Sequence, residues 1–450
     1  MATRPSSTTR RLRGLAGVGL LYLAGLTTGP AVIHLDTGDP AAYTTTPGDN
    51  SGWQYQGQWG GFLGTPIAPF YFLSAGHIGN AGNSTFVFHG ETFNVVAGYT
   101  DPGSDLLLWK VDHAFATYAP LFQPHDASDT EVGRELRVFG CGTQRGGEMI
   151  FGGTARGWAW GAGDSVERWG SNVVSAIEPD GSQRYLRAAF DSPGIPGEAH
   201  LSVGDSGGGL FILQDGLWRL AGINYAVDDL YTGANGSGGF TAAIYDARGY
   251  YTQTGTNTYS LVTGSTNVPT SFYSTQVAAR LDWIKLIVGA NAFNALPAEN
   301  YDAWTHAYFT PDQRADVTAT GPGADPDADG VSNLLEYAFN LDPTHSSPVT
   351  MTAGTGLRGL PLVQLENISG LGPRLTVEFV RRTAASGAGI TYAAQFVSRL
   401  DAAGGGWQAG GTESVTAINE RWERVKVTDA AARGTARFAR VVVTRTDAVP

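Results

Sequence analysis

The stretch LSVGDSGGGLF, residues 201–211, places Ser206 among glycines and directly after Asp205. One interpretation is an ordinary Gly-rich turn between two strands, since the chain holds 62 Gly in 450 residues. The other is a catalytic nucleophile, because neighbours without Cβ atoms let a substrate carbonyl approach two backbone N–H groups closely. The stretch favours the nucleophile, and the rest of the chain decides between the two.

A serine nucleophile needs a base within hydrogen-bond reach and a carboxylate that orients this base. Of the eight histidines, His77 is the strongest candidate, because it follows the apolar run FYFLSAG, where a strand gives way to a turn. Asp105 directly precedes LLLWKV and therefore opens a predicted buried strand. Taken alone, such an aspartate is more often a turn or cap residue, but here it accompanies a histidine and a serine.

The order His77, Asp105, Ser206 along the chain resembles that of the chymotrypsin-like serine proteases. Four segments resemble that family: LSAGHIG, DLLLWKV, GDSGGG and the terminal FYSTQVAARLDWIKLIV, which together span most of residues 60–290. The resemblance implies that Ser206 attacks the scissile carbonyl, that His77 transfers its proton and that Asp105 holds the imidazole tautomer. It also implies that the backbone N–H groups of Gly204 and Ser206 form an oxyanion hole.

The chain departs from the family in several places. Gly209 stands where the family usually has Pro, and no IVGG-like start upstream supplies a new amine to pair with Asp205. Cys141 is the only cysteine, so the likeness is to cysteine-poor bacterial members and no internal disulfide can form.

The resemblance also implies which residues form the substrate pocket, because the family's pocket positions can be counted from the serine. Six residues before the serine, where the pocket floor lies, the chain has His200 rather than an acid, so a preference for basic residues is not expected; a loop histidine is the other interpretation. The strand AGINYAV is expected to pair with substrate backbone. Its wall residues would be Asn224, Tyr225, Ala226 and Val227.

Composition and charge limit the classes of protein. A hydrophobic fraction of 42% with 11% aromatic residues can build real cores, and the low charged fraction of 16% with many turns favours short strands. The net charge of -12 argues against nucleic acid as a partner, because phosphate binding relies on Lys and Arg.

The first thirty residues have the layout of a secretory signal peptide. Four arginines precede an apolar run from Leu15 to Leu26, which is too short to span a bilayer comfortably; an anchoring helix is the alternative. No later segment is apolar enough for a membrane span. The chain is therefore expected to be secreted, periplasmic or at the cell surface.

The expected fold class is mainly β, with four regions. The signal peptide, residues 1–30, precedes a chymotrypsin-like double β-barrel, residues 31–290, closed by a helix in which Val277, Leu281, Ile284 and Val288 recur at helical spacing. A connector follows, residues 291–342, and then a small β-sandwich-like domain, residues 343–450. This last domain is expected to bind a surface or matrix ligand.

The connector contains DPDADGVSNLLE, residues 325–336, which matches a twelve-residue calcium loop with Asp at positions 1, 3 and 5, Gly at 6 and Glu at 12. The pattern resembles the single-loop calcium motifs of dockerin-like and thrombospondin type 3-like segments, and the preceding TATGPGA is not expected to form a helix. The alternative is an acidic linker in which Asp329 caps the following helix. The expected ligands of a structural Ca²⁺ are Asp325, Asp327, Asp329, the Val331 carbonyl and Glu336, with Asn333 acting through water.

The expected function is that of a secreted serine endopeptidase that cleaves protein or peptide substrates and needs no cofactor for catalysis. The alternative is a catalytically silent adhesion or binding protein that keeps a protease-like domain. No H-E-x-x-H sequence occurs, which argues against a zinc peptidase.

Overall fold

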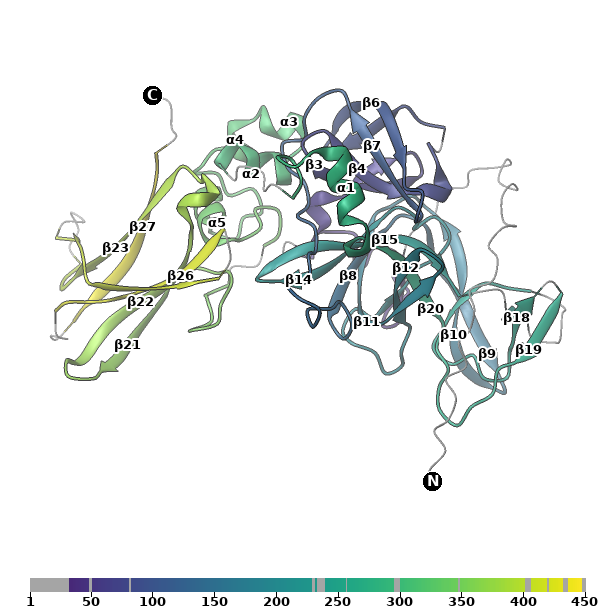
Figure 1. Cartoon of the computed structure of the whole chain (residues 1–450). Coiled ribbons are helices and arrows are strands. Elements are labelled where there is room, and N and C mark those ends of the chain that lie inside the picture. Colours follow the sequence, from purple (N-terminus) through teal and green to yellow (C-terminus); the bar gives the residue numbers. More distant parts are fainter. Residues whose placement is uncertain are drawn as a thin grey trace.

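The computed structural model describes residues 32–446, except 48–50, 81, 229–230, 233–238, 256, 295–299, 347–348, 401–405, 419–420 and 432–435. The expected signal peptide lies outside the described residues. Figure 1 shows a large N-terminal part built of purple and teal strands, a group of short helices, and a smaller yellow-green β part at the C-terminal end.

The N-terminal part contains two closed six-stranded antiparallel barrels. The first has the strand order β2 (Gly57–Trp59), β3 (Phe62–Ala68), β4 (Tyr71–Ala75), β7 (Leu106–Val111), β6 (Glu91–Thr100) and β5 (Thr85–Phe88). The second has the order β11 (Arg168–Asp180), β12 (Gln183–Ala189), β20 (Ser271–Gln276), β15 (Leu217–Val227), β14 (Gly209–Gln214) and β8 (Glu135–Gly140). The prediction of a mainly β chain is confirmed, and the two barrels are compatible with a chymotrypsin-like double barrel.

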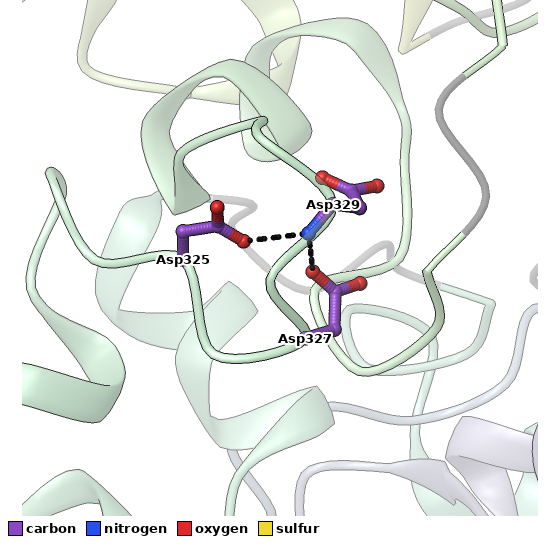
Figure 2. A group of neighbouring side chains, drawn as sticks. All are labelled: Asp325, Asp327 and Asp329. Atoms are coloured by element: carbon purple, nitrogen blue, oxygen red, sulfur yellow. Dashed lines mark hydrogen bonds between the residues drawn. The ribbon is translucent and has the colours of Figure 1, made fainter.

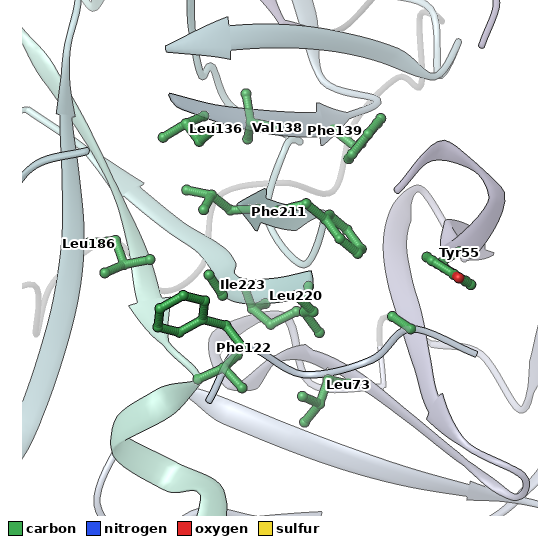
Figure 3. Packing of buried hydrophobic residues seen from close by; sticks show 14 of the residues in the cluster. Tyr55, Leu73, Phe122, Leu136, Val138, Phe139, Leu186, Phe211, Leu220 and Ile223 are labelled. Carbon is green, nitrogen blue, oxygen red and sulfur yellow. The ribbon is translucent and has the colours of Figure 1, made fainter. Parts of the chain in front are cut away.

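One hydrophobic core extends across both barrels. Leu63 and Leu73 of the first barrel belong to the same buried cluster as Val138, Phe211 and Ile223 of the second. Figure 3 shows Leu73 of the first barrel near Phe211 and Ile223 of the second. Burying each large apolar side chain contributes roughly 1.5–3 kcal/mol, so this shared core holds the two barrels against each other.

Three small sheets surround the second barrel. A short pair joins β1 (Ile33–His34) to β13 (Ala199–His200), just before the Ser206 loop. The others arise from insertions between barrel strands, and they contain β9 (Thr143–Phe151), β10 (Thr154–Gly163) and β17 (Ala242–Ile244) in one sheet, and β16 (Tyr231–Thr232), β18 (Tyr251–Gly255) and β19 (Thr258–Leu261) in the other.

Helices are short throughout the described residues. They are η1 (Trp53–Tyr55), η2 (Gly76–Ile78), η3 (Ala278–Arg280), α1 (Leu281–Val288), α2 (Tyr301–Tyr308), α3 (Pro311–Arg314), α4 (Val317–Thr320), α5 (Asn333–Phe339) and η4 (Ala384–Ser386). Helix α1 follows β20, buries Ile284 and Val288 in the shared core, and ends at Gly289, whose φ is 86°. None of the described helices is long and apolar enough to cross a membrane.

The expectation that TATGPGA forms no helix was wrong for its first three residues. The single turn α4 covers them, with Asp316 accepting a hydrogen bond at its N-terminus. The helix stops at Gly321, whose backbone turns extended before Pro322, because a residue preceding proline is disfavoured in the helical conformation.

The C-terminal part consists of two antiparallel sheets with a common core. One sheet contains β21 (Leu362–Ile368), β22 (Gly372–Arg382), β26 (Trp422–Thr428) and β25 (Thr412–Ala417), and the other β24 (Gln408–Ala409), β23 (Ile390–Val397) and β27 (Phe438–Arg445). Ala338 and Phe339 of α5 are buried in that core. The end of the predicted connector therefore packs as part of the C-terminal part.

Direct contacts join the C-terminal half of the chain to the segment that precedes the first barrel and to the turn between β5 and β6. Thr46 donates a hydrogen bond to the Asp342 carboxylate at 3.1 Å, and His89 bonds to the backbone carbonyl of His306. The buried side chain of Arg421 bonds to Tyr55. These buried and half-buried polar groups thus join the N-terminal part to the connector and to the C-terminal part.

Candidate functional site

The three candidate catalytic residues come from three loops at the junction of the barrels. His77 lies in η2, directly after the buried strand β4, and Asp105 lies directly before β7, which pairs with β4. Ser206 lies between β13 and β14, on the side of the second barrel. Pairing of β4 with β7 brings His77 and Asp105 together, whereas Ser206 reaches them only because the barrels pack against each other.

The three side chains form one hydrogen-bonded chain. Nδ1 of His77 is 2.7 Å from Oδ2 of Asp105, and Nε2 of His77 is 2.8 Å from Oγ of Ser206. The other carboxylate oxygen, Oδ1 of Asp105, accepts the backbone N–H of His77 at 2.8 Å. Because a carboxylate can only accept, Nδ1 must carry the proton, which leaves the Nε2 lone pair free to accept the Ser206 hydroxyl proton.

The loop around Ser206 is shaped to present two backbone donors. Among the described residues, neither the N–H of Gly204 nor that of Ser206 has an intramolecular acceptor. Gly204 has φ +95°, and a Cβ there would stand 2.8 Å from Cα of Gly142, so only glycine fits. Two unpaired donors beside a nucleophile can stabilise a developing oxyanion.

The buried carboxylate of Asp205 holds this loop through hydrogen bonds. Its carboxylate is 1% exposed and accepts the N–H of Gly142 at 2.8 Å and the N–H of Ser202 at 2.7 Å. Burial raises the pKa of Asp205 to about 6, while its hydrogen bonds, including one from the backbone of Val32, oppose this rise. The segment at Val32 thus contacts the carboxylate for which the sequence offered no partner.

The structure also explains Gly209, at which the chain departs from the family. Its N–H donates to Oε1 of Gln56 at 3.0 Å, in the interior between the barrels. Proline has no N–H and would leave the buried amide oxygen of Gln56 without this donor.

The side chains of two expected pocket residues are buried in the second barrel. His200 is 1% exposed, with Nδ1 2.6 Å from the Leu201 carbonyl and Nε2 3.1 Å from Oγ1 of Thr270. Asn224 is 1% exposed, and its amide donates to the carbonyls of Phe139 and Asp205. The polar atoms of both side chains therefore already bond to protein groups.

The remaining pocket candidates are half-buried at the end of β15. A β-bulge takes Tyr225 out of the pairing with β20, and its ring lies edge-on to His77 at a centroid distance of 5.6 Å. Ala226 and Val227 follow and pair only with β20 among the described residues, because pairing with β14 ends at Ile223. Residues 225–227 therefore leave one strand edge available beside Ser206.

Burial of His200 makes the fold sensitive to acid. Burial lowers the pKa of His200 from 6.5 to about 4, so the folded state binds this proton less well than the unfolded chain. The neutral, buried His200 therefore leaves the free energy of unfolding undiminished above about pH 6.5, and this free energy falls as the pH drops towards about 4. From about pH 7.5 to about pH 5, we expect His200 to account for a loss of about 2 kcal/mol.

Urea unfolding at both pH values measures this loss. The free energy of unfolding should differ less between the two pH values in a His200→Gln variant, by about 2 kcal/mol. Some pH dependence should remain in the variant, because burial also lowers the pKa values of His34 and His89 to about 4. An unchanged pH dependence in the variant would show that His200 is not buried neutral.

The acidic loop brings three carboxylates together. Oxygen atoms of Asp325, Asp327 and Asp329 all lie within 4.8 Å of one another. Figure 2 shows the carboxylates of Asp325 and Asp327 turned towards the backbone N–H of Asp329, to which they bond at 3.1 and 3.3 Å. The N-cap of α5 is Ser332, so the alternative in which Asp329 caps that helix was wrong.

Glu336, the expected last ligand, lies in α5. It is 1% exposed, and within the described part of the chain neither carboxylate oxygen has a hydrogen-bond partner. Burial, and then the charges of Asp327 and Asp329, raise the pKa of Glu336 to about 9. A buried carboxylate without a donor, facing other acids, fits a site built for a cation. Val331 is also buried.

Sequence reasoning missed the residues that support the nucleophile loop. Ser202 lies three residues before Asp205, a spacing at which local hydrogen bonds are common, so its role could have been recognised. Gly142 and Val32 bond to the same carboxylate from distant parts of the chain, and no local pattern indicates them.

Comparisons with known proteins assign this chain to no family. No family model matches the chain, and no curated protein matches it. Solved structures similar to it include the passenger domain of Plasmid encoded toxin, an autotransporter enterotoxin from enteroaggregative Escherichia coli. That match has 11% sequence identity and a TM-score of 0.30, and it covers 53% of this chain and 22% of the other.

Proposed function

We propose that this protein is a serine endopeptidase that cleaves protein or peptide substrates through an acyl-enzyme. The observation that carries the proposal is the continuous hydrogen-bonded chain from Asp105 through His77 to Ser206. Its members come from both barrels, and their order and partners match the requirements of an activated serine. The chymotrypsin-like double barrel is part of this proposal.

Each residue has a chemical role in the proposed reaction. His77 accepts the Ser206 hydroxyl proton at Nε2 as Oγ attacks the carbonyl carbon, and then donates it to the leaving amine. Asp105 keeps the other proton on Nδ1 and stabilises the imidazolium. The N–H groups of Gly204 and Ser206 bind the oxyanion, and water repeats the sequence to release the acid.

Substrate backbone would pair with the open edge of residues 225–227. An extended peptide added there gains main-chain hydrogen bonds with β15 and places its carbonyl next to Ser206. His200 is buried and burial lowers its pKa to about 4, so position 200 offers substrate no charged group.

Labelling with a fluorophosphonate tests the proposal. Native protein should become labelled on Ser206, as read by peptide mass spectrometry, while Ser206→Ala and heat-unfolded protein should not. A folded wild-type protein that remains unlabelled would contradict the proposal and favour the catalytically silent binding protein. The N-terminal sequence pattern supports a secreted, periplasmic or cell-surface location, where the C-terminal part would bind a surface or matrix ligand.

We also propose that the loop Asp325–Glu336 holds a structural Ca²⁺. Three adjacent carboxylates and the buried, donor-free Glu336 support a hard cation with oxygen ligands. Asp325, Asp327, Asp329, Glu336 and the Val331 carbonyl would hold it. The ion would neutralise their mutual repulsion and stabilise the start of α5, whose residues pack in the C-terminal core.

Limited proteolysis measures this effect. Calcium should suppress cutting between residues 291 and 343, because a ligand that binds only the folded form stabilises it by about 2.7 kcal/mol at a hundredfold excess over Kd. Asp329→Ala should remove the protection, whereas the exposed Asp312→Ala should keep it. Peptide turnover should hardly change. Equal cutting rates in calcium and in chelator would leave the loop as an acidic linker.

A further inference from the structure

The loop that carries Asp105 begins at a buried aspartate. Asp101 follows β6, and its N–H donates to the Leu106 carbonyl at 3.0 Å, which closes the turn DPGSD between β6 and β7. Its own carboxylate accepts the N–H of Gly103 at 3.0 Å and the hydroxyl of Ser104 at 2.5 Å. The carboxylate of Asp101 therefore organises the whole turn from inside.

Arg280 reaches this carboxylate from the segment that directly follows the second barrel. It lies in η3, between β20 of the second barrel and α1, and its Nε and Nη2 donate to the two oxygens of Asp101. The side chain of Asp101 is 0% exposed and that of Arg280 is 20% exposed. The pair is thus a bidentate, largely desolvated bridge between the two barrels.

The turn is shaped around the guanidinium. A Cβ on Gly103 would stand 2.6 Å from Nη2 of Arg280, so the guanidinium lies directly against the Gly103 backbone. The hydroxyl of Ser182, in the turn between β11 and β12, donates to the Gly103 carbonyl at 3.1 Å. Two contacts from the second barrel therefore hold a turn of the first.

The held turn ends at Asp105. Its backbone carbonyl accepts the N–H of Gly76 at 2.8 Å, and its side chain bonds to both the backbone and the ring of His77. Asp105 and His77 belong to the first barrel, but Ser206 belongs to the second. The hydrogen bond from His77 to Ser206 therefore requires a fixed relation between the barrels, and the bridge at Asp101 sets that relation four residues from Asp105.

We propose that Arg280 and Asp101 are positioning residues for the His77–Asp105–Ser206 chain, an inference that rests on the proposed peptidase function. Neither touches substrate. Replacing a buried ion pair by other well-packed groups often leaves stability unchanged. We therefore expect this pair to act mainly by fixing the position of the turn that carries Asp105. A displacement of about 1 Å in a catalytic group can cost about 10²-fold in rate.

A second buried ion pair supplies a control away from the triad. Arg156 and Asp246 join β10 to the loop after β17, with side-chain exposures of 21% and 1%. This pair is similarly buried, but Asp246 also bonds to Arg248, and the pair lies beside the β9–β10–β17 sheet rather than in the turn that ends at Asp105. Arg248 still pairs with Asp246 in Arg156→Gln, so this variant removes a largely buried guanidinium away from the triad and should leave catalysis alone.

Steady-state kinetics of folded variants tests the proposal. We expect Arg280→Gln to lower kcat about 10²-fold with little change in KM, Arg280→Lys to recover part of the loss, and Gly103→Ala, which displaces the guanidinium, to lower kcat about tenfold. Arg156→Gln should stay within about twofold of the wild type. A kcat near wild type in folded Arg280→Gln or Gly103→Ala would overturn the proposal, as would an equal loss in Arg156→Gln.

An NMR measurement separates this proposal from the peptidase function. The proton on Nδ1 of His77, bonded to Asp105, should exchange faster with water in Gly103→Ala and Arg280→Lys than in the wild type or Arg156→Gln. This signal needs no turnover. Wild-type protein that neither labels nor hydrolyses peptides would refute the peptidase function, whereas unchanged exchange in both variants would refute the positioning role.

Discussion

Replacing Ser206 with alanine is expected to lower kcat for peptide hydrolysis by about 10⁶-fold. The loss is large because Oγ is the only group that accepts the acyl chain, and His77 without it has no proton to take. The residual rate would come from the N–H groups of Gly204 and the residue at 206, which the substitution preserves. Hydrolysis of a fluorogenic peptide library, with product analysis to locate the cleaved bonds, measures the loss in kcat and the residual rate of the variant.

Ser175→Ala is a suitable control for that experiment. Its hydroxyl donates to the Arg187 carbonyl on the surface of the second barrel, away from the triad. The two variants should unfold within a few degrees of the wild type, so that a lost rate reflects lost chemistry. Undiminished hydrolysis by purified Ser206→Ala protein would contradict the assignment of Ser206 as the nucleophile.

Replacing Asp105 with asparagine is expected to cost about 10⁴-fold in kcat. The asparagine has one acceptor oxygen where the carboxylate has two, and that oxygen is needed by the backbone N–H of His77. The amide NH₂ then faces Nδ1, which must give up its proton and become an acceptor. The proton moves to Nε2, and His77 can no longer take the proton of Ser206.

The kinetics should show a fall in kcat with little change in KM, because Asp105 makes no contact with substrate in the proposed mechanism. Asp112→Asn is the matched control, since Asp112 lies directly after the same strand, β7, at the surface. It should keep kcat within about twofold. Near-normal turnover in Asp105→Asn would show that another acid orients His77. Asp101→Asn should slow the reaction less than Asp105→Asn, since it acts through the position of the turn.

The candidate triad was readable from the sequence because each member has a local signature. His77 ends an apolar strand, Asp105 begins one, and Ser206 follows an acid among glycines. The strand that precedes His77 pairs with the strand that follows Asp105, so their meeting depends on one pairing alone. Predictions of this kind succeed where a short stretch of sequence determines both the element and the position of the residue at its end.

The pocket residues show where local patterns are insufficient. Counting back from Ser206 reached His200, but the count carries no information on burial. Thr270 lies seventy residues further along the chain, and its hydroxyl is within hydrogen-bond distance of Nε2 of His200. Asn224 was likewise read as a wall residue from its strand, whereas packing of β15 against the Ser206 loop turns its amide inward.

The sequence by itself determined the β class, the order of the triad residues and the spacing of acids in the loop Asp325–Glu336, because periodicity, chain order and spacing are properties of a one-dimensional string. Only the tertiary structure decided which donors surround Asp205, why Gly204 must lack a side chain, and that Arg280, after the last strand of the second barrel, bonds to Asp101 in a turn of the first. Apart from the bonds of Ser202 to Asp205, those contacts join residues 62 to 179 positions apart, and nothing local in the sequence indicates which segment supplies the partner. They exist because the shared hydrophobic core packs the two barrels together, and a buried charge such as the Asp205 or Asp101 carboxylate is costly unless donors surround it.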